Sequence, residues 1–158
     1  MIIFINGTIN SGKTTISKLL QKRIPKSAVV EVDALRAFID WLPLEQAIPI
    51  NLKNTVSIIK NFVSEDINVI IPYPLSEKNH EFFSKELAGI DQKIIFITLA
   101  PQLEKVLENR GTRELTEKEK QRIRYHYDIG IESPSFGAII DNSNQAPEQT
   151  VEEILKKL

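Results

Sequence analysis

Short apolar runs alternate along this chain with longer segments in which apolar residues recur at helical spacing. Five runs rich in Ile and Val predict strands, at residues 2–6, 28–32, 67–71, 93–99 and 138–141. The segments between and after them predict helices at residues 13–23, 34–41, 52–64, 77–87, 102–109, 117–127 and 148–158. Because the strands are apolar on both faces, we expect a mostly parallel sheet with helices covering both sides.

An alternating β–α order over a chain of this length is typical of a three-layer α/β/α fold with right-handed crossovers. The sequence contains no repeat, low-complexity tract or linker, so residues 1–158 are expected to form one domain. Ligands of such sheets bind beyond the carboxyl ends of the strands. Candidate chemistry is therefore expected in the loops that follow each strand.

The composition narrows the classes of function. Twenty Lys and Arg against 21 Asp and Glu leave a net charge of −1, so no broad nucleic-acid-binding surface is expected. The chain has no cysteine, which excludes disulfides, cysteine-ligated metals and thiol nucleophiles. Its apolar runs are too short to cross a bilayer, and it opens without the pattern of a signal peptide. We expect a cytoplasmic protein with no membrane partner, and the sequence leaves its oligomeric state open.

The strongest motif follows the first predicted strand. Residues 7–15 fit the phosphate-binding pattern G-x-x-x-x-G-K-[ST], and they stand between a strand and a helix as that pattern requires. In such a loop the backbone N–H groups converge on the phosphates, the lysine reaches the β- and γ-phosphates, and the next hydroxyl ligates Mg²⁺. The motif assigns ATP binding to Gly7, Thr8, Ile9, Asn10, Ser11, Gly12, Lys13, Thr14 and Thr15, with Thr14 as a metal ligand.

With this motif at its start, the sequence resembles the small P-loop kinases: shikimate and gluconate kinases, chloramphenicol phosphotransferase and, more distantly, adenylate kinase. The resemblance spans nearly the whole chain. It implies a three-layer P-loop NTPase fold, with a five-stranded parallel sheet of order 2-3-1-4-5, and ATP and Mg²⁺ as cofactors. It also implies an acceptor-binding helical segment at about residues 34–64 and a short lid at about residues 110–124.

Two carboxylates stand where the family carries D-x-D at the end of its second strand. Asp33 resembles the residue that orients or deprotonates the acceptor hydroxyl, and Glu31 resembles the one that serves the water shell of Mg²⁺. Alternation along the predicted strand puts both carboxylates on one side. The alternative is that Asp33 only caps the following helix while Glu31 is solvated.

Two further residues are candidates for binding the acceptor. Arg36 completes a D-x-x-R pattern common in these kinases and offers a guanidinium to an anionic or polyhydroxyl acceptor, the alternative being an ion pair with Asp33. Tyr73 lies between two prolines after the third strand, and this stiff turn favours contact with the acceptor. Many relatives carry a carboxylate for Mg²⁺ at that turn, and this chain has none.

The expected lid and the loop after the last strand complete the candidate site. Arg113 is the candidate cation over the γ-phosphate, and Arg110 resembles the family residue that stacks on adenine. A solvated charged helix is the alternative, and Arg122 and Arg124 are expected on its surface, with one of them possible as a site-facing residue. Pro147 belongs to a loop that resembles the family's adenine loop, although an ordinary helix start explains it equally well.

Four other aromatic or imidazole side chains are assigned no chemistry. Phe38 and Trp41 fit packing in the core at least as well as a pocket wall. Aromatic packing is the simpler explanation for His126, and His80 is expected at the surface.

The sequence therefore predicts an ATP- and Mg²⁺-dependent kinase that phosphorylates a hydroxyl of a small molecule, either a metabolite or an antibiotic. Its predicted catalytic residues are Lys13, Asp33 and Arg113. Shikimate is disfavoured because Glu132 stands where shikimate kinases carry an arginine. The alternatives are a nucleoside or nucleotide kinase, disfavoured because no arginine follows the third strand, and a regulatory nucleotide-binding protein without acceptor chemistry.

Overall fold

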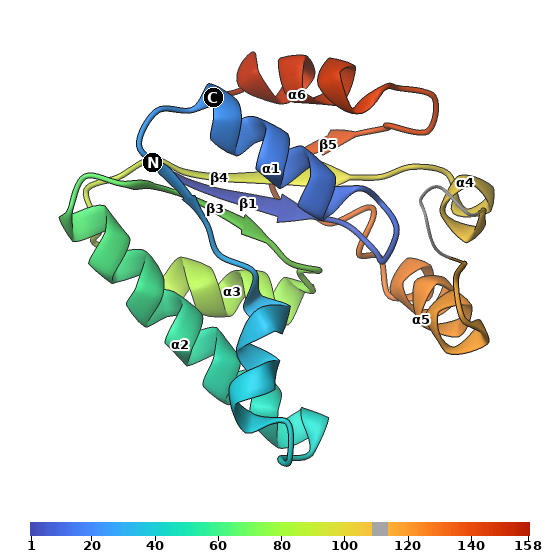
Figure 1. The fold of residues 1–158 in the computed structure, drawn as a ribbon, viewed down its shortest axis with the longest axis horizontal. Coiled ribbons are helices and arrows are strands. Elements are labelled where there is room, and N and C mark those ends of the chain that lie inside the picture. Colours follow the sequence, from blue (N-terminus) through green and yellow to red (C-terminus); the bar gives the residue numbers. More distant parts are fainter. Residues whose placement is uncertain (109–113) are drawn as a thin grey trace.

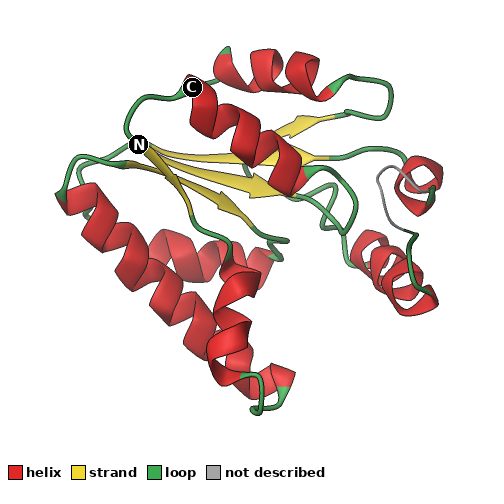
Figure 2. Cartoon of the chain, in the orientation of Figure 1, coloured by secondary structure: helices red, strands yellow, loops and turns green. Residues whose placement is uncertain are grey.

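The computed structural model describes residues 1–108 and 114–158. Its centre is a five-stranded, all-parallel sheet of order β2-β3-β1-β4-β5 (Figure 1), which confirms the expected order. The strands are β1 (Ile2–Asn6), β2 (Ser27–Val29), β3 (Asn68–Pro72), β4 (Ile94–Leu99) and β5 (Ala138–Ile140). All of them run in the same direction, so their carboxyl ends lie at the same end of the sheet (Figure 2).

Helices cover both faces of the sheet. Helices α1 (Lys13–Arg23) and α6 (Pro147–Leu155) lie on one face, and α2 (Leu44–Ser64) and α3 (Glu77–Glu86) lie on the other. Beyond the carboxyl ends of the strands lie the 3₁₀ helix η1 (Val32–Ile39) and helices α4 (Leu103–Leu107) and α5 (Glu117–Asp128). Within the described residues, no helix is long and apolar enough to span a membrane.

The central strand β1 shows why the chain adopts this architecture. All five of its residues are buried, and successive side chains enter opposite layers. Ile3 belongs to the cluster that contains residues of α1 and α6, whereas Phe4 belongs to the cluster that contains residues of α2 and α3. A strand with two apolar faces is stable only when both are covered, which is the situation that the sequence pattern predicts.

The second strand ends earlier than predicted, at Val29 instead of residue 32. This strand lies at the sheet edge and pairs only with β3, so its pairing stops once Val30 has donated its N–H to the carbonyl of Ile70. Val32 is then buried against the end of the sheet, in the first turn of η1. The expectation that Glu31 and Asp33 share one side of a strand is therefore wrong, because both lie in or beside a 3₁₀ helix.

Helix α2 begins eight residues earlier than predicted. Pro49 interrupts its hydrogen-bonding pattern, but this proline lies only five residues after the helix start at Leu44 and removes a single N–H donor. Burial of Ala47 on one side of the proline and of Leu52 on the other keeps both parts in one helix. Packing against the sheet thus outweighs the local preference that the sequence suggests.

Candidate functional site

The phosphate loop connects β1 to α1 at the carboxyl edge of the sheet. Gly7 has a φ of +143°, and a Cβ atom there would lie 2.7 Å from the carbonyl oxygen of Leu99. Gly12 has a φ of +100° at the position before α1, where side chains are strongly disfavoured. Both glycines of the motif are therefore required by the backbone path of the loop.

Asn6, the last residue of β1, fixes this loop to three neighbouring segments. Its Oδ1 accepts hydrogen bonds from the N–H groups of Gly7 and Leu75, each at 2.7 Å. Its Nδ2 donates to Thr98 Oγ1 at 3.0 Å and to the carbonyl of Ile131 at 2.9 Å. The buried amide thus makes four hydrogen bonds, which is its full capacity. The phosphate loop is held in register with the ends of β3 and β4.

A first cavity of about 540 Å³ lies over the phosphate loop. Its lining comes from the loop and from the start of α1 on one side, and from the segment after β5 on the other. The lining residues are Asn10, Ser11, Gly12, Lys13, Thr14, Thr15, Ile16, Asn142, Gln145, Pro147 and Thr150. A cavity of this size suits a ligand as large as a nucleotide. The predicted residue Pro147 and most of the predicted phosphate-binding residues therefore surround one space.

The Lys13 side chain crosses the loop, and its Nζ donates to the carbonyl of Thr8 at 2.6 Å. Burial lowers the pKa of Lys13 to about 8, and the negative charge of Asp33 partly opposes this shift. The ammonium is thus still protonated at neutral pH but sits in a poorly solvated position. An anion in the first cavity offers this ammonium a better partner than a backbone carbonyl.

Asp33 lines a second cavity, and its charge interacts with that of Lys13. Partial burial raises the pKa of Asp33, the charge of Lys13 lowers it, and the charge of Glu31 raises it. The two carboxylates are therefore neighbours even though they do not share a strand. A carboxyl group with a raised pKa near a cationic loop is suited to accepting a proton.

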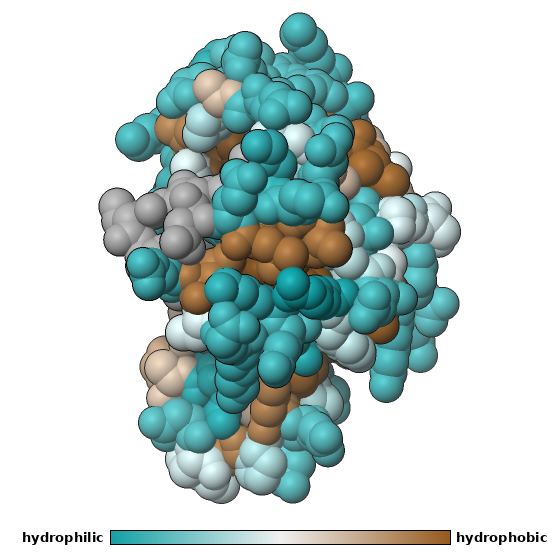
Figure 3. Space-filling view, turned by 90° about the vertical axis from the view of Figure 1, so that its right-hand side faces the viewer, coloured by the Kyte–Doolittle hydropathy of each residue, from teal (hydrophilic) through white to brown (hydrophobic). Residues whose placement is uncertain are grey.

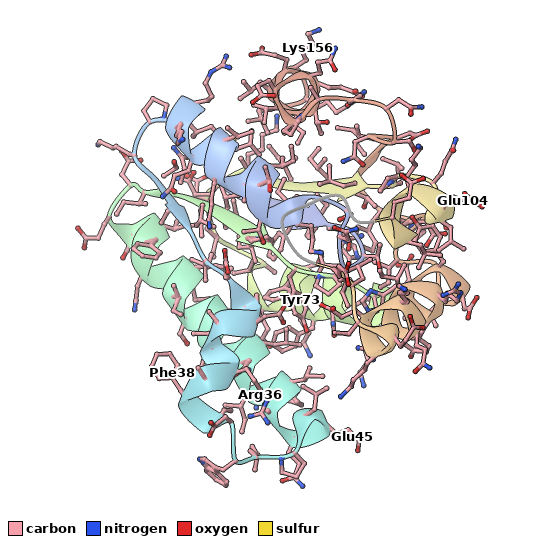
Figure 4. All side chains as sticks on the ribbon, turned by 45° about the vertical axis from the view of Figure 1, so that its right-hand side comes forward. Arg36, Phe38, Glu45, Tyr73, Glu104 and Lys156 are labelled. Atoms are coloured by element: carbon pink, nitrogen blue, oxygen red, sulfur yellow. The ribbon has the colours of Figure 1, made fainter. Side chains whose placement is uncertain are left out.

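The second cavity, of about 130 Å³, lies between η1, the start of α2 and the end of β3. It brings together Asp33, Arg36 and Tyr73, the three residues that the sequence predicts for acceptor binding, and adds Val32, Leu44, Ile48 and Asn51. Burial, followed by the charge of Asp33, raises the pKa of Tyr73 to about 12. The Tyr73 hydroxyl therefore stays protonated and can donate a hydrogen bond (Figure 4 shows Tyr73 on the sheet side of η1).

Arg36 lines this cavity, but its guanidinium is already engaged. It donates to the carbonyls of Ile39 and Leu42, and at 2.8 Å to that of Asp40, so it holds together the turn after η1. Neither of the two alternatives weighed from the sequence describes this arrangement, since Arg36 bonds to backbone carbonyls. The nearby Phe38 and Trp41 are 80% and 77% exposed, so core packing is wrong for both. The lobe of η1 and early α2 shows hydrophobic surface in Figure 3.

Sequence reasoning missed His126. This side chain is buried on α5, and its Nδ1 lies 3.0 Å from Thr8 Oγ1 in the phosphate loop. Its Nε2 accepts a hydrogen bond from Nε of Arg122 at 3.1 Å. Arg122 consequently faces the site, and its charge acts on both Asp33 and Tyr73. For His126, the signal in the sequence was its i, i+4 spacing from Arg122, a residue of the expected lid that the sequence left open as site-facing.

The remaining predicted residues divide into those that the structure describes and those that lie outside the described residues. Ile9 packs against the small cluster formed by α4 and α5, which supports the loop from outside the cavity. Glu31 is the half-buried residue before η1, and Thr14 is exposed on the rim of the first cavity. Arg110 and Arg113 lie outside the described residues. His80, expected at the surface, stacks on Phe136 with ring centroids 3.8 Å apart.

The donor set around the loop limits how a metal is held. Across residues 1–108 and 114–158, no group of three or more imidazoles and carboxylates is placed to hold a metal ion. The oxygen ligands that the sequence predicts for Mg²⁺ are few: the Thr14 hydroxyl on the first cavity and the Glu31 carboxylate, whose charge acts on Asp33. Such a set fits Mg²⁺ that keeps several waters and takes other ligands from nucleotide phosphates.

No family model matches the sequence. Among curated proteins, the "Putative adenylate kinase" of Sulfurisphaera tokodaii is 32% identical over 162 residues, covering 98% of this chain and 81% of that protein. The solved tunicamycin resistance protein of Deinococcus radiodurans has a TM-score of 0.70 at 22% identity, over 99% of this chain and 94% of that one. A solved sugar kinase from a Janibacter species has a TM-score of 0.74 at 19% identity, over 98% and 92% of the two chains.

The two solved structures establish the likeness of fold, at identities too low to carry more. The relative from Sulfurisphaera tokodaii matches in sequence along almost the whole chain, including the strand, loop and helix of the phosphate site. With the sheet order and the loop geometry, this match confirms the resemblance stated from the sequence: the chain belongs to the family of small P-loop kinases.

Proposed function

We propose that this protein is a kinase that transfers the γ-phosphoryl group of ATP to a hydroxyl of a small molecule, with residues 1–158 acting as one kinase domain. The position of Asp33 carries this proposal. Asp33 lines the smaller cavity, and its charge acts on Lys13, which lines the larger one. A carboxylate between a nucleotide-sized cavity and a second cavity stands where an acceptor hydroxyl must be positioned.

In the proposed reaction, ATP occupies the larger cavity with its phosphates against the loop and its base toward Pro147. Thr14 and, through water, Glu31 would hold Mg²⁺, which would offset the negative charge of the phosphates. Asp33 orients the acceptor hydroxyl and accepts its proton as the hydroxyl oxygen bonds to the γ-phosphorus. The bond to the bridging oxygen breaks, and ADP leaves. Lys13 stabilises the charge that develops on the phosphates, and Arg113 remains the predicted lid cation.

Arg122 joins this set; the sequence placed Arg122 and Arg124 on the helix surface and left open that one of them faces the site. Its guanidinium is held by His126 and acts on Asp33 from the side of α5, opposite the lobe of η1. A cation in that place favours the ionised form of Asp33, which is the form that accepts a proton. We therefore place Arg122 with Lys13 among the residues that set the charge balance of the site.

A nucleoside monophosphate kinase is the second candidate function, because the relative from Sulfurisphaera tokodaii carries the name of an adenylate kinase. That reaction needs cations for the acceptor phosphate. Arg36 is the one such residue among the described lining of the second cavity, and its guanidinium is engaged by backbone carbonyls. We therefore rank this candidate below transfer to an alcohol.

The test is ADP release from Mg-ATP, measured by an enzyme-coupled assay across neutral alcohols, nucleosides and nucleoside monophosphates. Lys13→Ala and Asp33→Asn are expected to abolish acceptor-dependent turnover. Their matched controls, Lys18→Ala and Asp91→Asn, change exposed residues outside both cavities and are expected to retain it. Turnover that no acceptor raises above the Asp33→Asn background would refute the kinase and favour a regulatory nucleotide-binding protein.

A further inference from the structure

A buried polar atom without a hydrogen-bond partner among the described residues belongs to the lining of the second cavity. Asn51 lies in α2, is 6% exposed and lines the cavity. Its Oδ1 is buried and has no hydrogen-bond partner among the described residues. Buried polar atoms are nearly always paired, so an unpaired amide on a cavity wall indicates a partner that arrives with a ligand. A hydroxyl group can satisfy either end of an amide, because it both donates and accepts.

The same cavity offers no free cation within its described lining. Arg36 lines the cavity, but its guanidinium already donates hydrogen bonds to the carbonyls of Ile39, Asp40 and Leu42. Arg122 and Lys13 act on Asp33 from outside this lining. The charges of both cations already act on the Asp33 carboxylate, so a ligand that brought a carboxylate or phosphate beside Asp33 would have to compete with it for them. The ligand is therefore uncharged.

The dimensions and the apolar walls restrict the ligand further. The cavity volume of about 130 Å³ is close to the roughly 150 Å³ that encloses a benzene molecule in an engineered protein cavity. Val32, Leu44 and Ile48 supply apolar walls, and Leu44, 55% exposed, lies at the rim. The enclosed part of a ligand is thus about one six-membered ring, with apolar surface on at least one side.

We propose that the acceptor is an uncharged diol on a compact, partly apolar body, with one hydroxyl held at Asp33 and the second held by Asn51. This inference rests on the proposed kinase function and specifies its acceptor. It makes Asn51 a specificity residue, and it predicts that the second hydroxyl is used for binding while the first receives the phosphoryl group.

The experiment compares acceptors of one size that differ in a single group: cis-1,2-cyclohexanediol, cyclohexanol and a hydroxycyclohexanecarboxylic acid, with AMP as a phosphate-bearing acceptor. Wild type is expected to show a kcat/KM for the diol at least about tenfold above that for cyclohexanol. The two anions are expected to stay at background. Asn51→Leu is expected to remove the preference for the diol, whereas Asn54→Leu, an exposed change on the same helix, keeps it.

The outcomes separate the inference from the proposed function. Faster turnover of the anions, or an unchanged diol preference in Asn51→Leu, overturns the inference and leaves the kinase standing. If no acceptor is turned over, the kinase fails, and binding is read from the Asn51 side-chain amide signals, assigned by their loss in Asn51→Leu. A diol-dependent shift of those signals supports the subsite, and their constancy up to the solubility of the diol overturns it as well.

Discussion

His126 Nδ1 lies 3.0 Å from Thr8 Oγ1, which connects helix α5 directly to the phosphate loop across 118 residues of sequence. Since Nε2 of His126 accepts from Arg122, the ring proton is on Nδ1 and is donated to Thr8. Burial, followed by the charges of Arg122 and Lys13, lowers the pKa of His126 to about 4. The ring is thus neutral at physiological pH, and its tautomer is set by the two partners.

This arrangement predicts an acid-sensitive stability. The pKa of His126 falls from its ordinary 6.5 to about 4 on folding, so the unfolded chain binds more protons between these values. Above pH 6.5 His126 is neutral in both states and does not affect the free energy of unfolding. As the pH falls to 4, the unfolded chain takes up the proton first, and the free energy of unfolding decreases by about 3 kcal/mol in total. Urea unfolding of wild type and His126→Gln at pH 7 and pH 4.5 measures it as a difference. An equal loss in both proteins would contradict the assignment, and His80→Gln serves as the control.

Arg122 is expected to hold the pKa of His126 down. Replacing it by glutamine removes a positive charge beside the ring, so the pKa of His126 rises from about 4 toward its ordinary value. With only two histidines in the chain, NMR titration of the ring protons follows each one separately. Arg124→Gln, which changes an exposed residue of the same helix, is the matched control. An unchanged His126 titration in Arg122→Gln would show that the two side chains are not in contact in solution.

A side chain at Gly7 would destabilise the fold in two separable ways: through the strain of a positive φ and through a close contact with the backbone. Gly7→Ala places a methyl group 2.7 Å from the Leu99 carbonyl in addition to the strain of a positive φ. We expect it to lower the free energy of unfolding by at least about 3 kcal/mol and to abolish ATP binding. Gly89 also has a positive φ, of +84°, but a Cβ atom there would have no neighbour within 4 Å, so Gly89→Ala should cost only about 1–2 kcal/mol. Thermal unfolding of both variants compares them, and equal costs would refute the close contact.

The unpaired side-chain amide of Asn51 is expected to lower the free energy of unfolding of the ligand-free protein. Its buried Oδ1 has no partner in the described chain, so Asn51→Leu, which replaces the amide by an apolar group of similar size, should stabilise the fold by about 1–2 kcal/mol. Differential scanning calorimetry without ligand measures the increase in Tm. Asn54→Leu, on the exposed face of α2, is expected to change Tm by much less. A lower Tm for Asn51→Leu would mean that the amide is already paired.

ATP binding is expected to weaken as Lys13 loses its proton. Burial lowers the pKa of this lysine to about 8 in the free protein, so its positive charge is present below pH 8 and is lost above it. Above that pH the Kd for Mg-ATP should rise by up to about tenfold per pH unit, as measured by calorimetric titration at pH 7 and pH 9. Lys13→Arg keeps its charge at both values, and its Kd should be nearly independent of pH. The same pH dependence in both proteins would place the titrating group elsewhere.

The sequence determined the parts of this protein whose physics is local. The bounds of β1 and α1 are as predicted, because an apolar run, two glycines and a helical period specify strand, turn and helix within 23 residues. Both faces of β1 are apolar, so helices on both sides of a parallel sheet followed from the pattern. The strand order came from the resemblance to the family, since the pairing partners of a strand are not encoded in its own residues.

Tertiary structure decided which side chains meet. The partners of His126 and Asn6 come from segments up to 125 residues away, and no local pattern records such pairs. Arg36 could be assigned to an acceptor from its spacing, but only the turn after η1 shows that its donors are taken by carbonyls. Whether a polar group is free or paired depends on how the elements pack around it. For that reason the sequence predicts where phosphate binds, and the folded chain was needed to describe the cavity beside it.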